Sequence, residues 1–275
     1  SRGLGDVYKR QILLGFGMNL FEIFRVGSQS LLIIISTIGT ALVVSYAVSR
    51  IMKIDHDIAT LVGVGSSICG GSAIAAAAPV IKASDEDIAQ SISVIFLFNV
   101  IAAFLFPTLG AILGFNDMGF GMWAGTAIND TSSVVAAGQT WASASGSDTA
   151  LNYATIVKLT RTLAIIPICL GLAYLTSKRK ATTSEVKISS IFPMFIIYFL
   201  GASIINTFAG SHFDFFQFLP AIGKFMIAMA MAAIGLNTNL VKLIKTGGKP
   251  ILLGLICWFC IAVVSLAMQH LLNIW

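Results

Sequence analysis

Apolar runs of about 20 residues, separated by short polar segments, follow one another along most of the chain. A helix of this length crosses the hydrocarbon core of a bilayer, which is about 30 Å thick. The pattern predicts six membrane-spanning helices, at residues 31–50, 91–113, 151–175, 188–207, 219–236 and 251–272. The expected fold is therefore all-α, that of a polytopic membrane protein.

The N-terminal residues do not fit this pattern. Residues 1–11 are abruptly more polar than the residues after them, and we interpret them as a non-native lead-in. The next apolar run, residues 12–24, is too short for a full span. Because the rest of the chain contains no long polar linker, residues 12–275 are expected to form a single transmembrane domain that lacks its native N-terminal helix or helices.

The composition supports a membrane setting. Of the 275 residues, 57% are hydrophobic and 11% are charged, and the mean hydropathy is +0.90. So few charges cannot cover a soluble surface. The net charge of +5 comes mostly from short loops, which indicates topology rather than nucleic-acid binding, and predicts that the loops at 178–187 and 242–249 are cytoplasmic. The four cysteines lie in apolar stretches, so neither a disulfide nor a metal site is expected.

Two apolar segments, 58–82 and 119–140, contain residues that interrupt a helix. The first includes VGVGSSICGGSAIAAAAPVIK, with Gly70 and Gly71 at its middle. A helix that stops at these glycines and restarts leaves unpaired backbone N–H groups at the new start, and such a start binds anions. We expect the Ser72 side chain to cap this second half-helix.

The second segment repeats the first. Sliding the chain against itself by 60 residues pairs the two segments, and sliding it by 220 residues pairs 15–32 with 235–252. Duplicated halves with broken helices are how secondary transporters build a binding site at the membrane midplane. The 220-residue copies are expected to be inverted in the membrane. The 60-residue copies are inverted if each broken segment re-enters on one side, and parallel if each crosses.

Basic residues also lie inside a predicted span. Lys158 and Arg161 are three residues apart and share one helix face. Each charge at membrane depth costs about 2.5–3.5 kcal/mol on insertion scales, so the pair needs a partner. Asp130, at the second break, is the expected partner, and a purely structural ion pair supplemented by backbone carbonyl contacts is the alternative.

These groups define a candidate binding site for a small anion. It comprises the backbone and side chains of the two breaks and the two cations: Ser67, Cys69, Gly70, Gly71, Ser72, Asn129, Asp130, Thr131, Ser132, Lys158 and Arg161. No catalytic group and no cofactor are expected. Ser203 stands in a GxSx pattern, but the three histidines lie in loops or at a span end, so an intramembrane protease is disfavoured.

Four ordered segments carry a resemblance to a known family: VGVGSSICGGSAIAAAAPVIK, GMWAGTAINDTSSVVAAG, ATIVKLTR and MAAIGLNTNLVKLIKTGGKP. They resemble the YeiH-type family of bacterial inner-membrane proteins, which are labelled as sulfate exporters. Family members typically carry His where this chain has Asn129 and Gln where it has Ser133.

The resemblance implies a multi-pass secondary transporter of the bacterial inner (plasma) membrane, distantly similar in fold to cation-proton antiporters and bile-acid symporters. Its implied substrate is a small inorganic anion such as sulfate or a related sulfur oxyanion. An anion channel, or an ion-coupled symporter or antiporter of a small organic anion, remains the alternative. The expected partners are the small anion substrate and the lipid bilayer, and no nucleic acid is expected. A coupling ion, H+ or Na+, and a homo-oligomer are left open.

Overall fold

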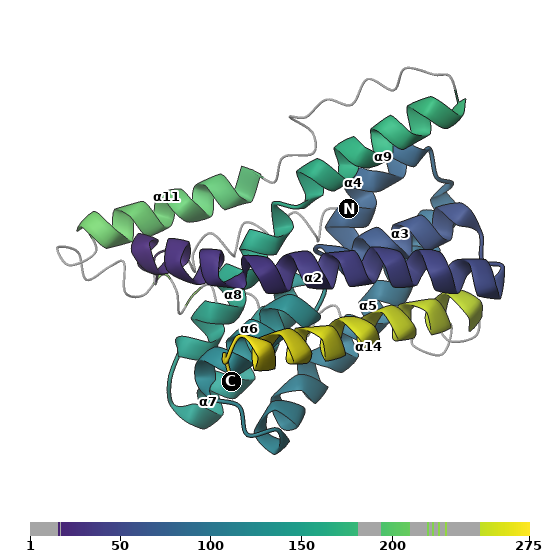
Figure 1. Cartoon of the computed structure of the whole chain (residues 1–275). Helices are drawn as coiled ribbons and strands as arrows, with labels where there is room; N and C mark the ends of the chain where they lie inside the picture. The colour runs from purple at the N-terminus through teal and green to yellow at the C-terminus, as the bar shows by residue number, and fades with distance from the viewer. Residues whose placement is uncertain are drawn as a thin grey trace.

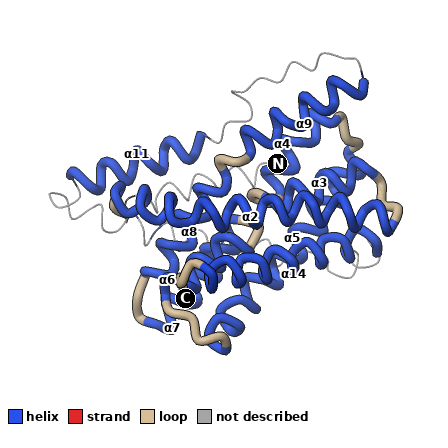
Figure 2. Tube along the Cα trace, in the orientation of Figure 1, coloured by secondary structure: helices blue, strands red, loops and turns tan. Residues whose placement is uncertain are grey.

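The computed structural model describes residues 16, 18–180, 194–209 and 248–275, together with the single positions 219, 222, 225 and 229. Helices are the regular secondary structure of this part of the chain (Figures 1 and 2). Their bounds are α2 Leu20–Met52, α3 His56–Ser67, α4 Gly71–Ile81, α5 Asp85–Ile112, α6 Asp117–Ala127, α7 Thr131–Ser145, α8 Thr149–Thr162, α9 Ile165–Lys180, α11 Met194–Ala209 and α14 Gly248–Leu271.

Four stretches of helix are long and apolar enough to cross a membrane: Leu20–Met52, Asp85–Ile112, Thr149–Thr176 and Gly248–Leu271. They confirm the predicted all-α class and four of the six predicted spans. Of the span at 188–207, only α11, with 16 residues, is described. The span at 219–236, the lead-in at 1–11, the basic side chains at 178–187 and 242–247, and the repeat segment at 235–247 lie outside the described residues.

The start of the first span was predicted wrongly. Instead of a short apolar run at 12–24 and a separate span at 31–50, α2 is one helix of 33 residues. Asn19 caps it, because its side chain accepts a hydrogen bond of 2.9 Å from the N–H of Phe21. Glu22 and Arg25 are both helical, and Arg25 is exposed.

The predicted span at 151–175 consists of two helices. The α8 helix ends at Thr162 and α9 begins at Ile165, with turn-type backbone hydrogen bonds from Leu163 N–H to Thr160 and from Ala164 N–H to Arg161. Pro167 accounts for this interruption, because a proline lacks an N–H and its ring clashes with the carbonyl four residues earlier.

The first broken segment is a re-entrant hairpin. Helices α3 and α4 meet at a turn at residues 68–70, and both outer ends of the pair lie together. Carboxylate oxygens of Asp55 and Asp57, at the start of α3, lie within 4.8 Å of a carboxylate oxygen of Asp87, at the start of α5. Since α5 begins soon after α4 ends, the chain leaves on the side where it entered.

The second broken segment is a hairpin of the same kind. The Trp141 indole N–H, near the end of α7, donates a 2.8 Å hydrogen bond to Asp117 at the start of α6. Trp141 also stacks on Phe120 with ring centroids 4.2 Å apart. The two hairpins are joined by α5, whose 28 residues extend about 42 Å. The two hairpins therefore enter the bundle from opposite ends. Because each hairpin leaves on the side where it entered, the 60-residue copies are inverted relative to each other.

Helices α2 and α14 belong to the 220-residue copies, and they lie side by side in opposite directions (Figure 1). Trp275, after the end of α14, accepts a hydrogen bond from the Asn116 side chain beside the start of α6. The end of α2 lies instead at the outer ends of the first hairpin. The opposite directions of α2 and α14 (Figure 1) are those that the predicted inversion requires, while residues 235–247 of the second copy lie outside the described residues.

The basic residues gather at one end of the bundle. Arg50, Lys53 and Lys82 flank the outer ends of the first hairpin. Thr176, near the end of α9, lines a cavity of about 240 Å³ together with His56 and other residues of that end. By the positive-inside rule, this is the end predicted to face the cytoplasm.

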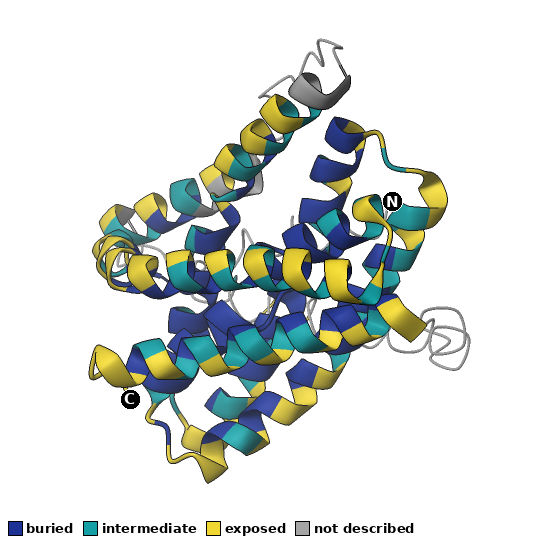
Figure 3. Cartoon of the chain, turned by 45° about the vertical axis from the view of Figure 1, so that its right-hand side comes forward, coloured by how far each residue is buried: buried dark blue, intermediate teal, exposed yellow. Residues whose placement is uncertain are grey.

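Small residues let the second hairpin pack closely on α8. A Cβ built on Gly121 would lie 2.6 Å from Tyr153 Cβ, and one built on Gly125 would lie 2.8 Å from the Ala154 carbonyl oxygen. Such close backbone approach is the usual packing of membrane helices, where van der Waals contact replaces the hydrophobic effect. Helices α6 and α8 are accordingly the most buried of the described elements, with 9 of 11 and 11 of 14 residues buried, whereas α2, α9 and α14 keep exposed residues along their length (Figure 3).

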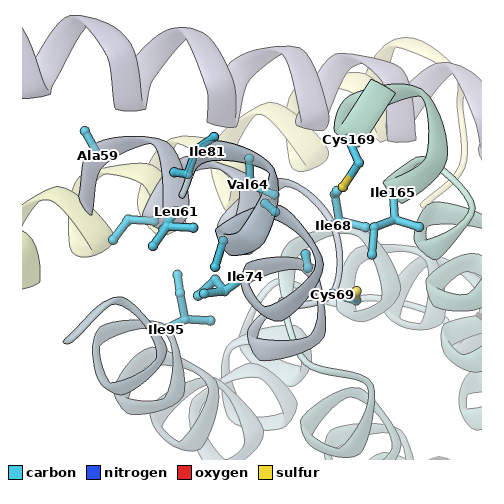
Figure 4. Packing of buried hydrophobic residues seen from close by; sticks show 14 of the residues in the cluster. Ala59, Leu61, Val64, Ile68, Cys69, Ile74, Ile81, Ile95, Ile165 and Cys169 are labelled. Carbon is cyan, nitrogen blue, oxygen red and sulfur yellow. The ribbon is translucent and has the colours of Figure 1, made fainter. Parts of the chain in front are cut away.

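The tip of the first hairpin packs into an apolar cluster that fixes its position (Figure 4). Ile68, in the turn between α3 and α4, packs with Ile165 and Cys169 of α9. On the other side, Ile74 of α4 packs with Ile95 of α5. The break is therefore held on both sides by spanning helices.

Re-entry can be tested by labelling single cysteines in a chain whose four native cysteines are replaced by alanine. We expect His56→Cys and Glu86→Cys to react with a membrane-impermeant maleimide from the cytoplasmic side. Ala111→Cys and Ala144→Cys, which are exposed at the other end of α5 and α7, should react only from the opposite side. Labelling of His56→Cys and Glu86→Cys from opposite sides would mean that the first segment crosses.

Candidate functional site

The tips of the two hairpins meet inside the bundle. A Cβ built on Gly70, in the first tip, would lie 3.7 Å from the Cβ of Asp130, in the second. The predicted breaks are at the observed places, since α3 ends at Ser67, α4 begins at Gly71, α6 ends at Ala127 and α7 begins at Thr131. Two half-helices therefore end, and two begin, where the tips meet. We call this place, formed by residues 66–72 and 126–132, the crossing.

Lys158 of α8 connects the two tips. Its ammonium donates hydrogen bonds to the Ile68 carbonyl, at 2.6 Å, and to the Ile128 carbonyl, at 3.0 Å. One acceptor follows the end of α3 and the other follows the end of α6. The lysine side chain is fully buried, at 0% exposure, so these carbonyls compensate its charge directly.

Arg161 lies one helical turn further along α8. It donates hydrogen bonds to carbonyls in the last turns of α3 and α6. Its Nε donates to the Ser67 carbonyl at 2.8 Å, and one terminal nitrogen donates to the Ser66 carbonyl at 2.6 Å. The other terminal nitrogen donates to the Thr126 carbonyl of α6. The planar guanidinium donates to three carbonyls at once through its fixed fork of N–H groups. A lysine at this position would not reproduce that geometry.

The two cations thus cap the carbonyl ends of both broken helices. The last carbonyls of an α-helix have no partner within the helix, and an unpaired carbonyl at membrane depth costs several kcal/mol. Each helix end also carries about half a negative charge. The burial of Lys158 and Arg161 is therefore compensated by backbone carbonyls, which is the carbonyl part of the alternative given above, without its ion pair.

Asp130 is not the ion-pair partner that the sequence suggested. Among the described residues the structure gives neither Lys158 nor Arg161 a salt bridge. The Asp130 carboxylate instead accepts hydrogen bonds from the N–H groups of Ser132, at 3.0 Å, and Ser133, at 3.3 Å. It is the N-cap of α7, and its negative charge faces the positive start of that helix.

Asn99 of α5 was missed from the sequence, although it is a lone amide in the apolar stretch IFLFNVIAAF. Its side-chain oxygen accepts the backbone N–H groups of Asn129, at 3.1 Å, and Asp130, at 3.2 Å. The same side chain borders Gly70, where an added Cβ would lie 3.4 Å from the Asn99 nitrogen. Asn99 therefore holds the second break in its extended conformation beside the first.

The start of α4 differs from the start of α7, because no side chain caps it. Its N-cap is Gly70, with φ of +68°, and no side-chain hydrogen bond is formed there. The expected cap, Ser72, was predicted wrongly: its hydroxyl donates to the Cys69 carbonyl at 3.2 Å and lies 3.0 Å from the Cys69 sulfur. Ser72 is already the second residue of α4, too far along the helix to reach the free N–H groups at its start.

Two buried polar side chains at the tips lack hydrogen-bond partners. Both the amide nitrogen and the carbonyl oxygen of Asn129 are unpaired, and the residue is 1% exposed. The hydroxyl of Ser66, in the last turn of α3, is likewise unpaired. Buried polar groups without partners are rare in folded proteins and are costly, so these two mark a place where a polar ligand can bind.

The remaining candidates are structural neighbours of these groups. Gly71 and Thr131 are the first residues of α4 and α7, and Cys69 is buried in the turn before Gly70. Ser67 contributes its carbonyl to Arg161, while its hydroxyl donates to the Val64 carbonyl at 2.9 Å. The structure thus gathers all eleven candidate residues at or beside the crossing. Carbonyls of Ile68, Thr126 and Ile128 also belong to it, and no side-chain pattern could have identified them.

The crossing carries a net positive charge. Lys158 and Arg161 provide two positive charges and Asp130 one negative charge. About half a charge lies at each helix end, negative where α3 and α6 end and positive where α4 and α7 begin, so these four contributions cancel. About one positive charge remains. Both cations are fully buried, whereas Asp130 is partly exposed.

Fold and crossing together define a multi-pass α-helical membrane protein with two opposed re-entrant hairpins. The chain belongs to the family described as conserved hypothetical protein 698, which matches residues 11–254. The resemblance to the YeiH-type family is thereby confirmed.

Relatives share most of the chain. It is 58% identical over 270 residues to a UPF0324 membrane protein of Streptococcus pyogenes serotype M3, covering 96% of this chain and 79% of the relative. It is 57% identical over 272 residues to a UPF0324 membrane protein of Streptococcus mutans, covering 96% and 80%. It is 54% identical over 278 residues to one of Fusobacterium nucleatum, again covering 96% and 80%. No solved structure matches the chain.

Adjacent glycines at the first break offer a matched test of this geometry. Gly70→Ala should lower the stability by about 1–2 kcal/mol, because φ of +68° is strained for alanine and the new Cβ would press on Ile95 and Asn99. Gly71→Ala should be neutral or slightly stabilising, since its Cβ would meet only an ordinary contact at 4.0 Å. Thermal melting of the two purified variants measures the difference, and equal losses would contradict the assigned conformation.

Proposed function

We propose that the protein is a secondary transporter of a small inorganic oxyanion in the bacterial inner membrane, and not an enzyme. The observation that carries this proposal is the meeting of two inverted half-helix pairs at a buried, net positive crossing. Inverted repeats with broken helices at membrane depth are the architecture in which carriers bind substrate and alternate its access.

The sign of the substrate follows from the charge at the crossing. About one uncompensated positive charge remains after the helix ends are included, and uncompensated charge at membrane depth is unfavourable. An anion relieves it, whereas a cation would increase it. The uncapped start of α4 supplies backbone N–H groups for an anion, as helix starts commonly do.

The groups around this start match an oxyanion. The unpaired Asn129 amide and Ser66 hydroxyl are hydrogen-bond donors in the same buried region. The ammonium of Lys158 uses two of its three N–H groups on carbonyls, which leaves one. Several donors in the same buried part of the molecule suit a tetrahedral oxyanion such as sulfate, which has four acceptor oxygens, better than a halide.

Asp130 is the negative group of the crossing. Its carboxylate accepts hydrogen bonds at the start of α7, and its Cβ would lie 3.7 Å from a Cβ added to Gly70, the N-cap of α4. The carboxylate therefore opposes an anion at the start of α4, and the donors of Lys158, Asn129 and Ser66 offset this repulsion.

Transport can be tested in proteoliposomes that contain the purified chain. We expect uptake of radiolabelled sulfate to be saturable and to be accelerated by sulfate inside the vesicles. Asn129→Leu should abolish it, whereas Trp258→Phe, which removes a buried unpaired indole N–H outside the hairpins, should leave it unchanged. Uptake that rises linearly with sulfate and ignores internal sulfate would indicate an anion channel.

Stability separates a binding role of Asn129 from a structural one. Because its amide is buried and unpaired, Asn129→Leu should stabilise the ligand-free protein by about 1 kcal/mol. Only Asn129→Leu should lose the rise in Tm that sulfate causes. A destabilised Asn129→Leu variant would mean that the amide supports the fold instead.

A further inference from the structure

Five backbone carbonyls at the crossing form two adjacent sites for cations. They belong to the ends of α3 and α6: Ser66, Ser67, Ile68, Thr126 and Ile128. Carbonyl oxygens at the unwound ends of half-helices are the ligands with which ion-coupled carriers hold Na+. Oxygen ligands of this kind suit hard cations in general.

Both sites are filled by side chains of α8. The position between Ile68 and Ile128 takes one carbonyl from each hairpin, and the Lys158 ammonium occupies it at 2.6 and 3.0 Å. The second position is taken by the Arg161 guanidinium. Since α8 packs closely on α6 and both side chains are fully buried, these cations stay in place through the protein's own packing.

We propose that Lys158 is a tethered substitute for a free alkali cation, and that it excludes Na+ and K+ from the hairpin crossing. An ammonium is a compact point charge, closer to an alkali ion than the planar guanidinium of Arg161 is. It also bridges the two hairpins, which a free cation in that position would do. Lys158 is thus the residue that determines cation specificity.

Transport should consequently need no Na+ gradient. This corollary rests on the proposed transport function, but the exclusion of Na+ does not, because it concerns binding alone. The two can therefore fail separately: a protein that transports nothing can still exclude Na+, and an anion carrier can prove to bind it.

Cation titrations of the purified protein, followed by thermal melting, test the exclusion. Chloride is held constant, and choline balances the added cation. The wild type should show the same Tm in Na+, K+ and choline. In choline, Lys158→Ala should have a lower Tm than the wild type, because the carbonyls of Ile68 and Ile128 lose their hydrogen-bond donor. Na+, K+ or methylammonium should then raise its Tm saturably, by about 3 °C at about tenfold the Kd.

Two further variants act as controls. Lys158→Met also removes the charge but fills the space, so it should melt lower without responding to any cation. Arg25→Ala removes an exposed cation of α2 and should behave like the wild type. A saturable rise in Tm with Na+ in the wild type, or a folded Lys158→Ala that responds to none of the cations, would overturn the proposal.

Radiolabelled sodium provides a measurement that needs no variant. The purified wild type should show no saturable binding of Na+. If Lys158→Ala does not fold, this measurement decides alone: saturable binding of Na+ to the wild type overturns the proposal, and its absence supports it.

Discussion

The structure depends on hydrogen bonds from two cations of α8 to the carbonyl ends of two broken helices. A re-entrant hairpin exposes half-helix ends at membrane depth, where no water can pair them. Lys158 bridges the two tips, and Arg161 serves the last turns of both half-helices. The cost of burying the cations and the cost of ending the helices are thereby offset by one set of contacts.

This arrangement makes the two ends of each break chemically different. The carbonyl ends are occupied by resident side chains, so they present no open position. At the helix starts, α7 is capped by Asp130, whereas α4 begins at Gly70 with no side-chain cap. Two inverted copies of one motif are therefore asymmetric where a ligand would bind, and the asymmetry arises because Asp130 in the second copy stands where the first copy has Gly70.

Several features were predictable because they depend on local chemistry. Hydropathy identified four spans that the described residues contain, and the glycines and capping residues located both breaks. The cap of α4 and the partner of Lys158 were predicted wrongly. Ser72 lies inside α4, beyond its cap position, and the acceptors of Lys158 are backbone carbonyls, which every residue possesses and which no residue type marks. Asn99 could have been found, since a lone amide in an apolar span needs a partner.

The sequence by itself determined the membrane setting, the duplicated breaks and the burial of two cations on one helix face, because apolar length, glycine position and helical spacing are local properties. Only the tertiary structure decided that the breaks re-enter from opposite sides, that their tips meet, and that Lys158 and Arg161 pair with carbonyls instead of Asp130. The physical reason is distance along the chain. Residues 68, 128 and 158 become neighbours only through the packing of α3, α6 and α8, and their shared contact is with backbone, which carries no sequence signal.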